Sequence, residues 1–317
     1  MRTFRTSLVV VSALTLGAVP IHGPHPLPDP APPHRSGTEL PELPRWGTHG
    51  HEVAARAATS VLPPGMPGFF RAAADRLVYL NPEPDRWRTD GRPEMRAAWA
   101  PDHYVNFENV PDEALQAPNR YGYIAALQVA GVDRPDQRAG FLPFAIVERY
   151  QRLVTEWELW RRESNPRRRS WIEARIIDDA GILGHFVTDG SQPLHTTIHY
   201  NGWATDEPNP EGFTLDRTLH GRFETEFVDR HVTQRAVDDL VRPPSPLSGD
   251  VRAAAFAYLR ETRSMVGELY RLDRDIGFDP DGPARSETVD FTASRLAEGA
   301  HMLAVLWLSA WEESGRE

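Results

Sequence analysis

The chain has 317 residues, with 35 basic and 45 acidic side chains and a formal net charge of −10. All of the basic residues are arginine, and the chain contains neither lysine nor cysteine. These absences exclude Schiff-base lysines, cysteine nucleophiles, disulfides, P-loops and cysteine-ligated zinc sites. A metal ion would therefore be bound by carboxylates and by some of the 12 histidines. The negative charge also argues against binding duplex DNA through a broad basic face.

The first 45 residues have the composition of a processing segment. Arg2 and Arg5 precede an apolar run, which predicts a signal peptide over residues 1–19 and an exported bacterial protein, secreted or periplasmic. Residues 20–45 are rich in proline and are predicted to form an extended linker or pro-segment that does not pack into a core. The composition changes at Trp46, where the folded domain, residues 46–317, is predicted to begin.

Helical signals dominate this domain and strand signals are nearly absent, which predicts a single all-α domain with several helices. Besides a helix at HGHEVAARAATSVL and one ending at Asp189, helices are predicted over residues 66–79, 141–162, 216–241, 249–274 and 286–313. The apolar run MLAVLWLSAW in the last of these is too short to span a bilayer, so a buried core helix is expected and a stable membrane span is not.

Two helix starts have recognisable capping residues. Thr48 is predicted to cap the first helix. Ser170 and Glu173 have the spacing of a capping box, which predicts a helix from Ser170 to Asp189.

Histidine and carboxylate residues recur at helical spacing in two segments. In DDAGILGHFVTDGSQPLH, His185 and Asp189 are four residues apart, so their side chains project from one face of a helix, about 5–6 Å apart. His195 follows after a turn. His220 and Glu224 repeat the spacing in LHGRFETEF. One such pair is more often a surface or capping contact, but two pairs and a turn histidine favour a zinc site built without cysteine.

Three earlier motifs add candidate ligands. Trp46 opens WGTHGHEVAARAA, with His51 five positions later, NPEPDRWR supplies Asp85, and APDHYVNFEN supplies His103. Each residue alone also has a structural interpretation: Trp46 as a core aromatic, Asp85 as a turn residue and His103 as a buried, hydrogen-bonded imidazole.

The order W-x4-H, D-x2-R, H, H-x3-D-x5-H, H-x3-(D/E) between Trp46 and Glu224 resembles the zinc-dependent superfamily of phospholipases C and single-strand-specific nucleases. The resemblance implies an all-α domain of that type, with three zinc ions per chain. It implies one zinc held by Asp85, His103, His185 and Asp189; a second bridged by Asp189 and held by His51 and the amino nitrogen and carbonyl oxygen of Trp46; and a third, more open zinc held by His195, His220 and Glu224.

The resemblance also implies a phosphodiester hydrolase. In such an enzyme, a water that bridges the two close zinc ions is acidified to hydroxide and attacks phosphorus in line. Asp85 and Asp189 take part through the metals, and Arg88 matches the arginine that faces the reacting phosphate. No protein nucleophile is needed, which suits a chain without lysine or cysteine, and no obligate protein partner is indicated.

The metal pattern does not distinguish a nuclease that acts on single-stranded DNA or RNA from a phospholipase C that acts on phosphatidylcholine-type lipids. The W-x4-H spacing, the gap from His195 to His220 and the HYVN motif resemble the nucleases. In that branch Tyr104 would stack on a base and Asn106 would hydrogen-bond to its edge, although the family usually has aspartate at this position and Tyr104 could simply pack.

Other features resemble the phospholipases, namely Glu224 in place of aspartate and the lack of disulfides. His49, however, stands where their choline-binding carboxylate is expected. A third hypothesis is a non-catalytic secreted helical protein with structural zinc, which the predicted open coordination positions disfavour. Because an amino ligand at Trp46 must be free, we also expect cleavage between Arg45 and Trp46.

Overall fold

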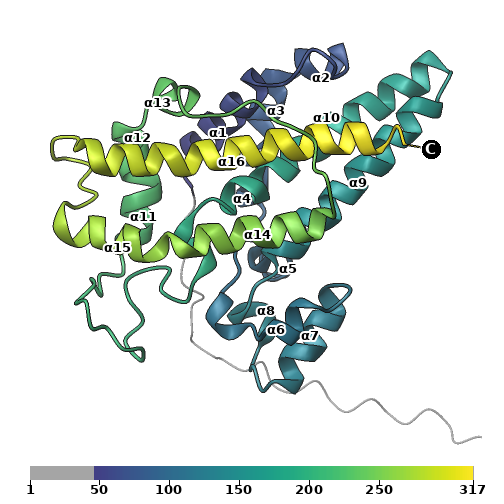
Figure 1. Cartoon of the computed structure of the whole chain (residues 1–317). Helices are drawn as coiled ribbons and strands as arrows, with labels where there is room; N and C mark the ends of the chain where they lie inside the picture. Colours follow the sequence, from purple (N-terminus) through teal and green to yellow (C-terminus); the bar gives the residue numbers. More distant parts are fainter. Residues whose placement is uncertain (1–45, 317) are drawn as a thin grey trace, which may run out of the picture. The chain divides into compact units, whose positions relative to one another are not determined.

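The computed structural model describes residues 46–316, which form helices joined by loops, with no strand among them (Figure 1). The predicted all-α domain is therefore confirmed. The signal peptide and the Pro-rich segment predicted over residues 1–45 lie outside the described residues. Within the described part, no helix is long and apolar enough to cross a membrane.

The described chain contains both long and short helices. The long helices are α1 (Thr48–Ser60), α7 (Arg120–Val129), α9 (Leu142–Arg162), α10 (Pro166–Asp189), α14 (Val251–Ser264), α15 (Val266–Asp275) and α16 (Ser286–Glu313). The short ones are α2 (Gly68–Ala72), α3 (Ala74–Leu80), α4 (Glu83–Arg86), α5 (Pro93–Trp99), α6 (Asp112–Leu115), α8 (Pro135–Arg138), α11 (Leu219–Gly221), α12 (Val228–His231) and α13 (Gln234–Asp238). The 3-10 turns η1 (Ala100–His103), η2 (Phe107–Asn109) and η3 (Pro193–Thr196) and the π-helical turn η4 (Arg222–Phe227) connect them.

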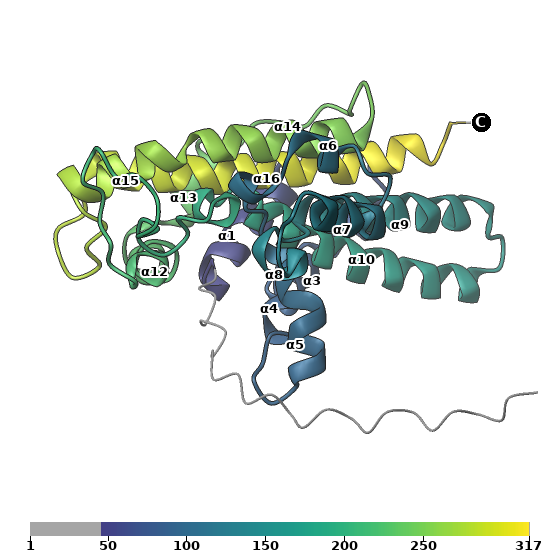
Figure 2. The same ribbon diagram turned by 90° about the horizontal axis from the view of Figure 1, so that it is seen from below.

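Helix α10 is the central element. It forms a hairpin with α9, seen in Figure 2, and also packs against α3 and α16. Helix α1 packs against α3 and α16, and both views show α14 and α15 running roughly parallel to α16. The indole of Trp307 in α16 is fully buried and donates a hydrogen bond to the carbonyl of Ala180 in α10 at 3.1 Å, which fixes how these two helices pack.

The longest helices agree best with the sequence predictions. Helix α16 spans the predicted range 286–313, and α9 begins one residue later than predicted. The apolar run in α16 lies in the core, as expected. The predicted start of α10 at Ser170 is wrong, because the side chain of Asn165 accepts hydrogen bonds from two backbone amides and Pro166 occupies the first helical turn. Thr48 is also not a cap, since it lies inside α1.

Three predicted helices are interrupted. Residues 66–79 form α2 and α3, and residues 249–274 form α14 and α15. The range 216–241 contains α11, η4, α12 and α13, with an extended Val232 and Thr233 before α13 and the Thr233 hydroxyl capping that helix. The short helices between residues 83 and 138 were not predicted. Prolines start several of them, and a proline lacks the N–H that a preceding turn would need.

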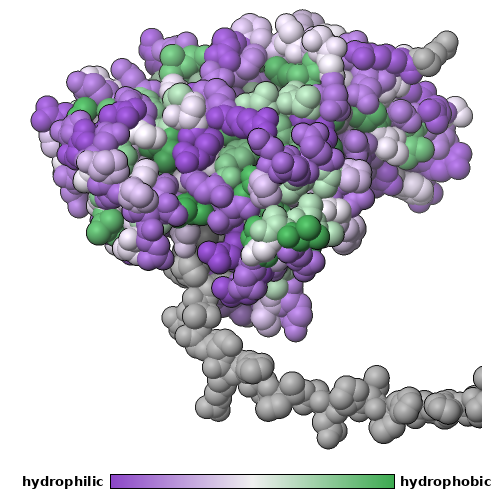
Figure 3. All heavy atoms as spheres, turned by 60° about the horizontal axis from the view of Figure 1, so that its bottom comes forward, coloured by the Kyte–Doolittle hydropathy of each residue, from purple (hydrophilic) through white to green (hydrophobic). Residues whose placement is uncertain are grey.

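The surface shown in Figure 3 is mostly hydrophilic, with hydrophobic side chains in small separate groups. The two most exposed large hydrophobic residues, Val129 and Tyr121, are both on α7, and others, such as Trp171 on α10, are on different elements. Single exposed hydrophobic residues are common in soluble proteins. The unusual chemistry of this domain is instead in its interior, where many titratable side chains are buried.

Candidate metal centre

The structure brings the predicted histidine and carboxylate ligands together in the interior. They come from seven different elements: α1 (His51), α4 (Asp85), η1 (His103), α10 (His185, Asp189), η3 (His195), α11 (His220) and η4 (Glu224). Every one of these side chains is buried, the most exposed being Asp85 at 5%. Burial of so many ionisable groups is costly unless they are paired or bind a metal ion. Three sets of them lie close enough to hold an ion.

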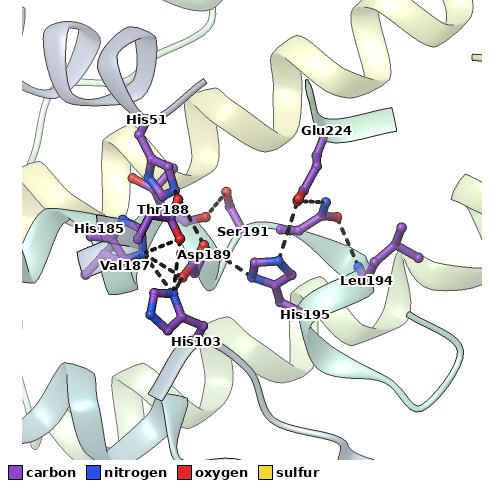
Figure 4. Close-up of polar contacts among 12 residues, drawn as sticks. His51, His103, His185, Val187, Thr188, Asp189, Ser191, Leu194, His195 and Glu224 are labelled. Carbon is purple, nitrogen blue, oxygen red and sulfur yellow. Dashed lines mark hydrogen bonds and ion pairs between the residues drawn. The ribbon is translucent and has the colours of Figure 1, made fainter. Parts of the chain in front are cut away.

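The first two sets share His185, and the carboxylate of Asp189 lies among their histidines (Figure 4). Its Oδ2 lies 2.9 Å from Nδ1 of His103 and 3.1 Å from Nε2 of His185, and its Oδ1 lies 3.6 Å from Nε2 of His51. Asp85 completes this region, with its Oδ1 3.8 Å from Nδ1 of His103 and its Oδ2 4.0 Å from Nε2 of His51. We name these five residues the Asp189 group.

The third set is formed by His195, His220 and Glu224, which we name the Glu224 group. The Oε2 of Glu224 lies 3.0 Å from Nε2 of His220 and 3.5 Å from Nε2 of His195. Nδ1 of His195 lies 3.2 Å from Oδ1 of Asp189, so His195 connects the two groups. These distances resemble the separation of about 3.3–3.6 Å between ligand atoms around a tetrahedral zinc ion with bonds of about 2.0–2.2 Å.

The hydrogen bonds of His51 and His185 provide a test of whether a metal fits. Nδ1 of His185 donates to the backbone carbonyl of Asn81, and Nδ1 of His51 donates to the Oδ1 of the same residue, both at 2.9 Å. In the neutral rings each Nε2 therefore carries a lone pair. Nε2 of His185 lies 2.9 Å from Nδ1 of His103 and 3.1 Å from Oδ2 of Asp189, whereas Nε2 of His51 faces Oδ1 of Asp189 at 3.6 Å. Buried acceptors that face each other require a cation or a proton between them, and Nε2 of His51 has no hydrogen-bond partner in the described chain. The residues therefore fit a metal ion.

Glutamine and a π-helical turn position the Glu224 group. The side-chain amide of the fully buried Gln192 donates to Oε2 of Glu224 at 2.8 Å and accepts from the amide of Leu194 at 3.0 Å. It thereby connects Glu224 to η3, which contains His195. Because η4 is π-helical, the carbonyl of Glu224 is available to accept from the amide of Gly47 at 3.3 Å. π-Helical turns of this kind often occur at functional sites.

Charge in the Asp189 group is set by burial and by Arg88. Burial lowers the pKa values of His51 and His103 to about 4 and about 3, so both imidazoles are neutral at pH 7. Burial alone would raise the pKa of Asp85, but the guanidinium of Arg88 and the neighbouring histidines outweigh it and lower that pKa to about 2. Neutral imidazoles and ionised carboxylates are the forms that bind metal ions.

In the Glu224 group, His195 has the opposite shift. Burial lowers its pKa, but the carboxylates of Asp189 and Glu224 outweigh burial and raise it to about 9. Burial raises the pKa of Glu224, but His220 and His195 outweigh burial and lower it below its usual value. An ionised Glu224 beside two imidazoles can bind a cation once His195 has lost its proton.

Arg88 lies at the edge of the Asp189 group. Its guanidinium is 3% exposed and donates a hydrogen bond through one terminal nitrogen to Oδ1 of Asp85. Its Nε has no hydrogen-bond acceptor in the described chain. Arg88 therefore has one buried N–H that remains available for an anion.

The remaining predicted residues are placed as follows. Trp46 is fully buried, with its ring 5.6 Å from that of Phe223, and the ligand role of its backbone stays a prediction. The hydroxyl of Tyr104 donates to the carbonyl of Gln137 at 2.6 Å, and the amide of Asn106 donates to the carbonyl of Arg138 at 2.9 Å. Tyr104 and Asn106 thus contact the segment before α9, and their predicted substrate contacts stay predictions.

Asn81 and Gln192 were missed as functional candidates. Asn81 lies four residues before Asp85, and Gln192 is part of the QPLH motif. Asparagine and glutamine are not usual zinc ligands, so their residue type did not mark them as candidates. Their hydrogen bonds join segments far apart in the sequence.

Comparison with models of known protein families finds no match, and no curated protein matches the sequence.

Proposed function

We propose that the chain is a zinc-dependent phosphodiester hydrolase with three zinc ions, two in the Asp189 group and one in the Glu224 group, and that its substrate is single-stranded DNA or RNA. The observation that supports this proposal most is the position of Asp189 between the two groups, with buried imidazole nitrogens of His103, His185 and His195 within 3.2 Å of its carboxylate oxygens. In a structural zinc site, four protein ligands normally surround one ion as a closed tetrahedron. Here the histidines and carboxylates form three adjoining sets instead.

The residues would divide the work as follows. Zinc, when bound, lowers the pKa of a coordinated water and withdraws charge from a phosphate oxygen. Asp189 and Asp85 hold the ions of the Asp189 group in place, and the Glu224 group holds the third ion. Arg88 binds the phosphate through the N–H that has no acceptor in the described chain and stabilises the negative charge that develops on its oxygens.

Trp46 leads to a proposal about maturation. Its amino nitrogen can bind zinc only when it is free, so the bond between Arg45 and Trp46 must be cleaved after export. The amide of Gly47 already bonds to the carbonyl of Glu224, which fixes the start of the domain beside the Glu224 group. Sequencing the amino terminus of the secreted, active protein tests this proposal. An active form that begins near residue 20 would contradict it.

Metal analysis and a substrate panel test the function. Protein purified without chelator should contain about three zinc ions per chain, and hydrolysis of single-stranded DNA and RNA should stop on chelation and return with zinc. Fewer than two zinc ions would contradict the trinuclear proposal. Zinc without activity on any phosphodiester would indicate a structural role.

Phosphatidylcholine vesicles belong in the same panel because Glu224, in place of an aspartate, is a feature in which this sequence resembles the phospholipases. Hydrolysis of the lipid without hydrolysis of nucleic acid would assign the chain to phospholipase C instead.

Arg88 provides a test within the site. Arg88→Gln should lower kcat/KM on each phosphodiester about 10²–10³-fold, the usual effect of removing one donor that stabilises a transition state. Arg86→Gln is the matched control, because Arg86 is two residues away but half-exposed, and it contacts Glu83 and the ring of Tyr79 rather than a candidate ligand. Full activity of Arg88→Gln would contradict the assigned role.

A further inference from the structure

Asn81 contacts two members of the Asp189 group at once. Its side-chain Oδ1 accepts from Nδ1 of His51, and its backbone carbonyl accepts from Nδ1 of His185, each at 2.9 Å. Asn81 is fully buried, and the two imidazole rings stack with their centroids 4.1 Å apart. One residue thus determines the orientation of two neighbouring rings that come from α1 and α10.

These two bonds also select the tautomers of the histidines. An oxygen of an amide can only accept, so each Nδ1 must carry a hydrogen, and in the neutral ring that can bind a metal ion Nε2 carries the lone pair. We propose that Asn81 is a positioning residue that holds His51 and His185 in the metal-binding tautomer, with both Nε2 atoms directed at the carboxylates of the Asp189 group. The inference rests on the proposed zinc site and extends it to a residue that binds neither metal nor substrate.

The packing of α3 on α10 explains how Asn81 reaches both rings. Asn81 directly follows the last residue of α3, and two glycines of α10 face this end of the helix. A Cβ at Gly181 would lie 2.5 Å from the Cβ of Leu80, and a Cβ at Gly184 would lie 2.5 Å from Nδ2 of Asn81. Any larger residue at these positions would push α3 away. The GILGH sequence therefore places Asn81 next to His185 and lets the two helices approach closely.

The side chain of Asn81 acts on His51 alone, whereas its backbone acts on His185. Substitutions at Asn81 therefore perturb one ring and leave the other hydrogen bond in place. Among the described residues, Asn81 accepts hydrogen bonds from His51 and His185 and none from the Glu224 group, which therefore serves as an internal reference. This separation makes the role of Asn81 measurable apart from the stability of the fold.

The test compares two substitutions of similar size in the full chain. Asn81→Asp keeps an acceptor at Oδ1 and should retain the zinc content and affinity of the wild type. Asn81→Leu removes the acceptor and should lower the affinity of one zinc about 10- to 100-fold, the usual effect of losing such a partner. The number of zinc ions retained at low free zinc should then fall by one, with the Glu224 group still loaded.

Zinc is measured per chain after dialysis against zinc buffers, and circular dichroism shows whether each variant is folded. Asn81→Leu with unchanged zinc affinity, or Asn81→Asp that loses zinc to the same extent, overturns the positioning role while the hydrolase proposal stands. A wild-type chain that binds zinc and hydrolyses no phosphodiester overturns the proposed function, and the zinc titrations of the Asn81 variants still decide the positioning role. If Asn81→Leu is unfolded, Asn81→Ser replaces it in the test. Its shorter side chain still carries an acceptor, so it should bind the same zinc with an affinity between those of the wild type and a variant without an acceptor. Wild-type zinc affinity of Asn81→Ser would overturn the positioning role.

Discussion

Oδ1 of Asp189 lies 3.2 Å from Nδ1 of His195, while Oδ2 of the same carboxylate faces His103 and His185. One carboxylate of the Asp189 group therefore also contacts a member of the Glu224 group. Asp189 can do this because it is the last residue of α10, with His185 one turn before it and η3, which contains His195, directly after it. The two groups are consequently expected to respond differently to single substitutions.

Asp189→Asn should remove more zinc than Glu224→Gln. The first change takes a negative charge from beside both ions proposed for the Asp189 group, so at least two zinc ions per chain should be lost, whereas the second should lose one. Asp178→Asn is the matched control, because Asp178 is on the same helix but pairs with Arg76 near the surface. Metal content at a fixed free zinc concentration checks the prediction. Equal losses in the two ligand variants would contradict the shared role of Asp189.

Zinc binding to the Glu224 group should release a proton at pH 7. Asp189 and Glu224 raise the pKa of His195 to about 9 despite its burial, so without metal this imidazole is protonated at neutral pH. Only the neutral imidazole can bind zinc, so the proton must leave. Calorimetric titration in two buffers with different ionisation enthalpies measures the released proton. The affinity should therefore rise with pH up to about 9, and a pH-independent affinity between pH 6 and 8 would contradict the assignment.

The stability of the α9–α10 hairpin should depend on Glu156, which is distant in sequence from every candidate ligand. Burial and the neighbouring Asp179 raise the pKa of Glu156 to about 8, although Arg175 and Arg152 oppose the shift. The folded chain thus keeps a proton that the unfolded chain loses above about pH 4.3. The stabilisation is complete below that pH and is lost as the pH rises to about 8.

Glu156→Gln replaces this carboxyl with a neutral group of the same shape. The free energy of unfolding of the variant should change less between pH 5 and 8 than that of the wild type, and the variant should be the more stable protein at pH 8.5. Urea unfolding at several pH values provides the comparison. Parallel pH profiles for the two proteins would show that Glu156 is ionised throughout.

Two glycines with positive φ should differ in their tolerance of alanine. Gly140 has φ +77°, and a Cβ there would overlap the carbonyl oxygen of Tyr104 and lie 2.6 Å from its Cδ2. Gly131 has φ +83° with no atom within 4 Å of a Cβ. Gly131→Ala should cost about 1–2 kcal/mol from backbone strain alone, and Gly140→Ala about 3 kcal/mol or more because overlap is added. Urea unfolding measures both, and equal costs would contradict the role of packing.

Gly140→Ala should also affect the Asp189 group. The segment around it bonds to the chain on either side of His103, with the amide of Phe141 bonded to the carbonyl of Pro101 at 2.7 Å and that of Leu142 bonded to the carbonyl of Tyr104 at 3.1 Å. A shift of Tyr104 therefore moves His103, and zinc affinity should fall in this variant and remain unchanged in Gly131→Ala.

The sequence predicted the fold where its signals are local. Helix α16 has a continuous apolar run and no proline, and its bounds were predicted correctly. The range 216–241 was predicted as one helix, but the chain is extended at Val232 and Thr233 caps a new helix there, and the carbonyl of Glu224 in the π-helical turn accepts from the distant amide of Gly47. Tertiary contacts thus override a periodic pattern.

Part of the candidate site could also be predicted, because some of its contacts are local in the sequence. His185 with Asp189 and His220 with Glu224 are pairs at helical spacing, and their contacts of 3.1 Å and 3.0 Å follow from that spacing. The approach of Asn81 to His51 cannot be read from spacing, because it depends on how closely α3 packs on α10. Gly181 and Gly184 permit this packing. Both glycines are visible in the sequence, but only the structure shows which helix packs against them.

The wide distribution of the ligands along the chain has a consequence for the order of folding. His51 lies in the first described helix and Glu224 lies beyond the middle of the chain, so a partly folded chain offers only the local pairs within α10 and around η4. Contacts between such distant segments form late because closing long loops is entropically costly. Zinc should therefore be bound after the helices have assembled, and it should slow unfolding far more than it accelerates folding.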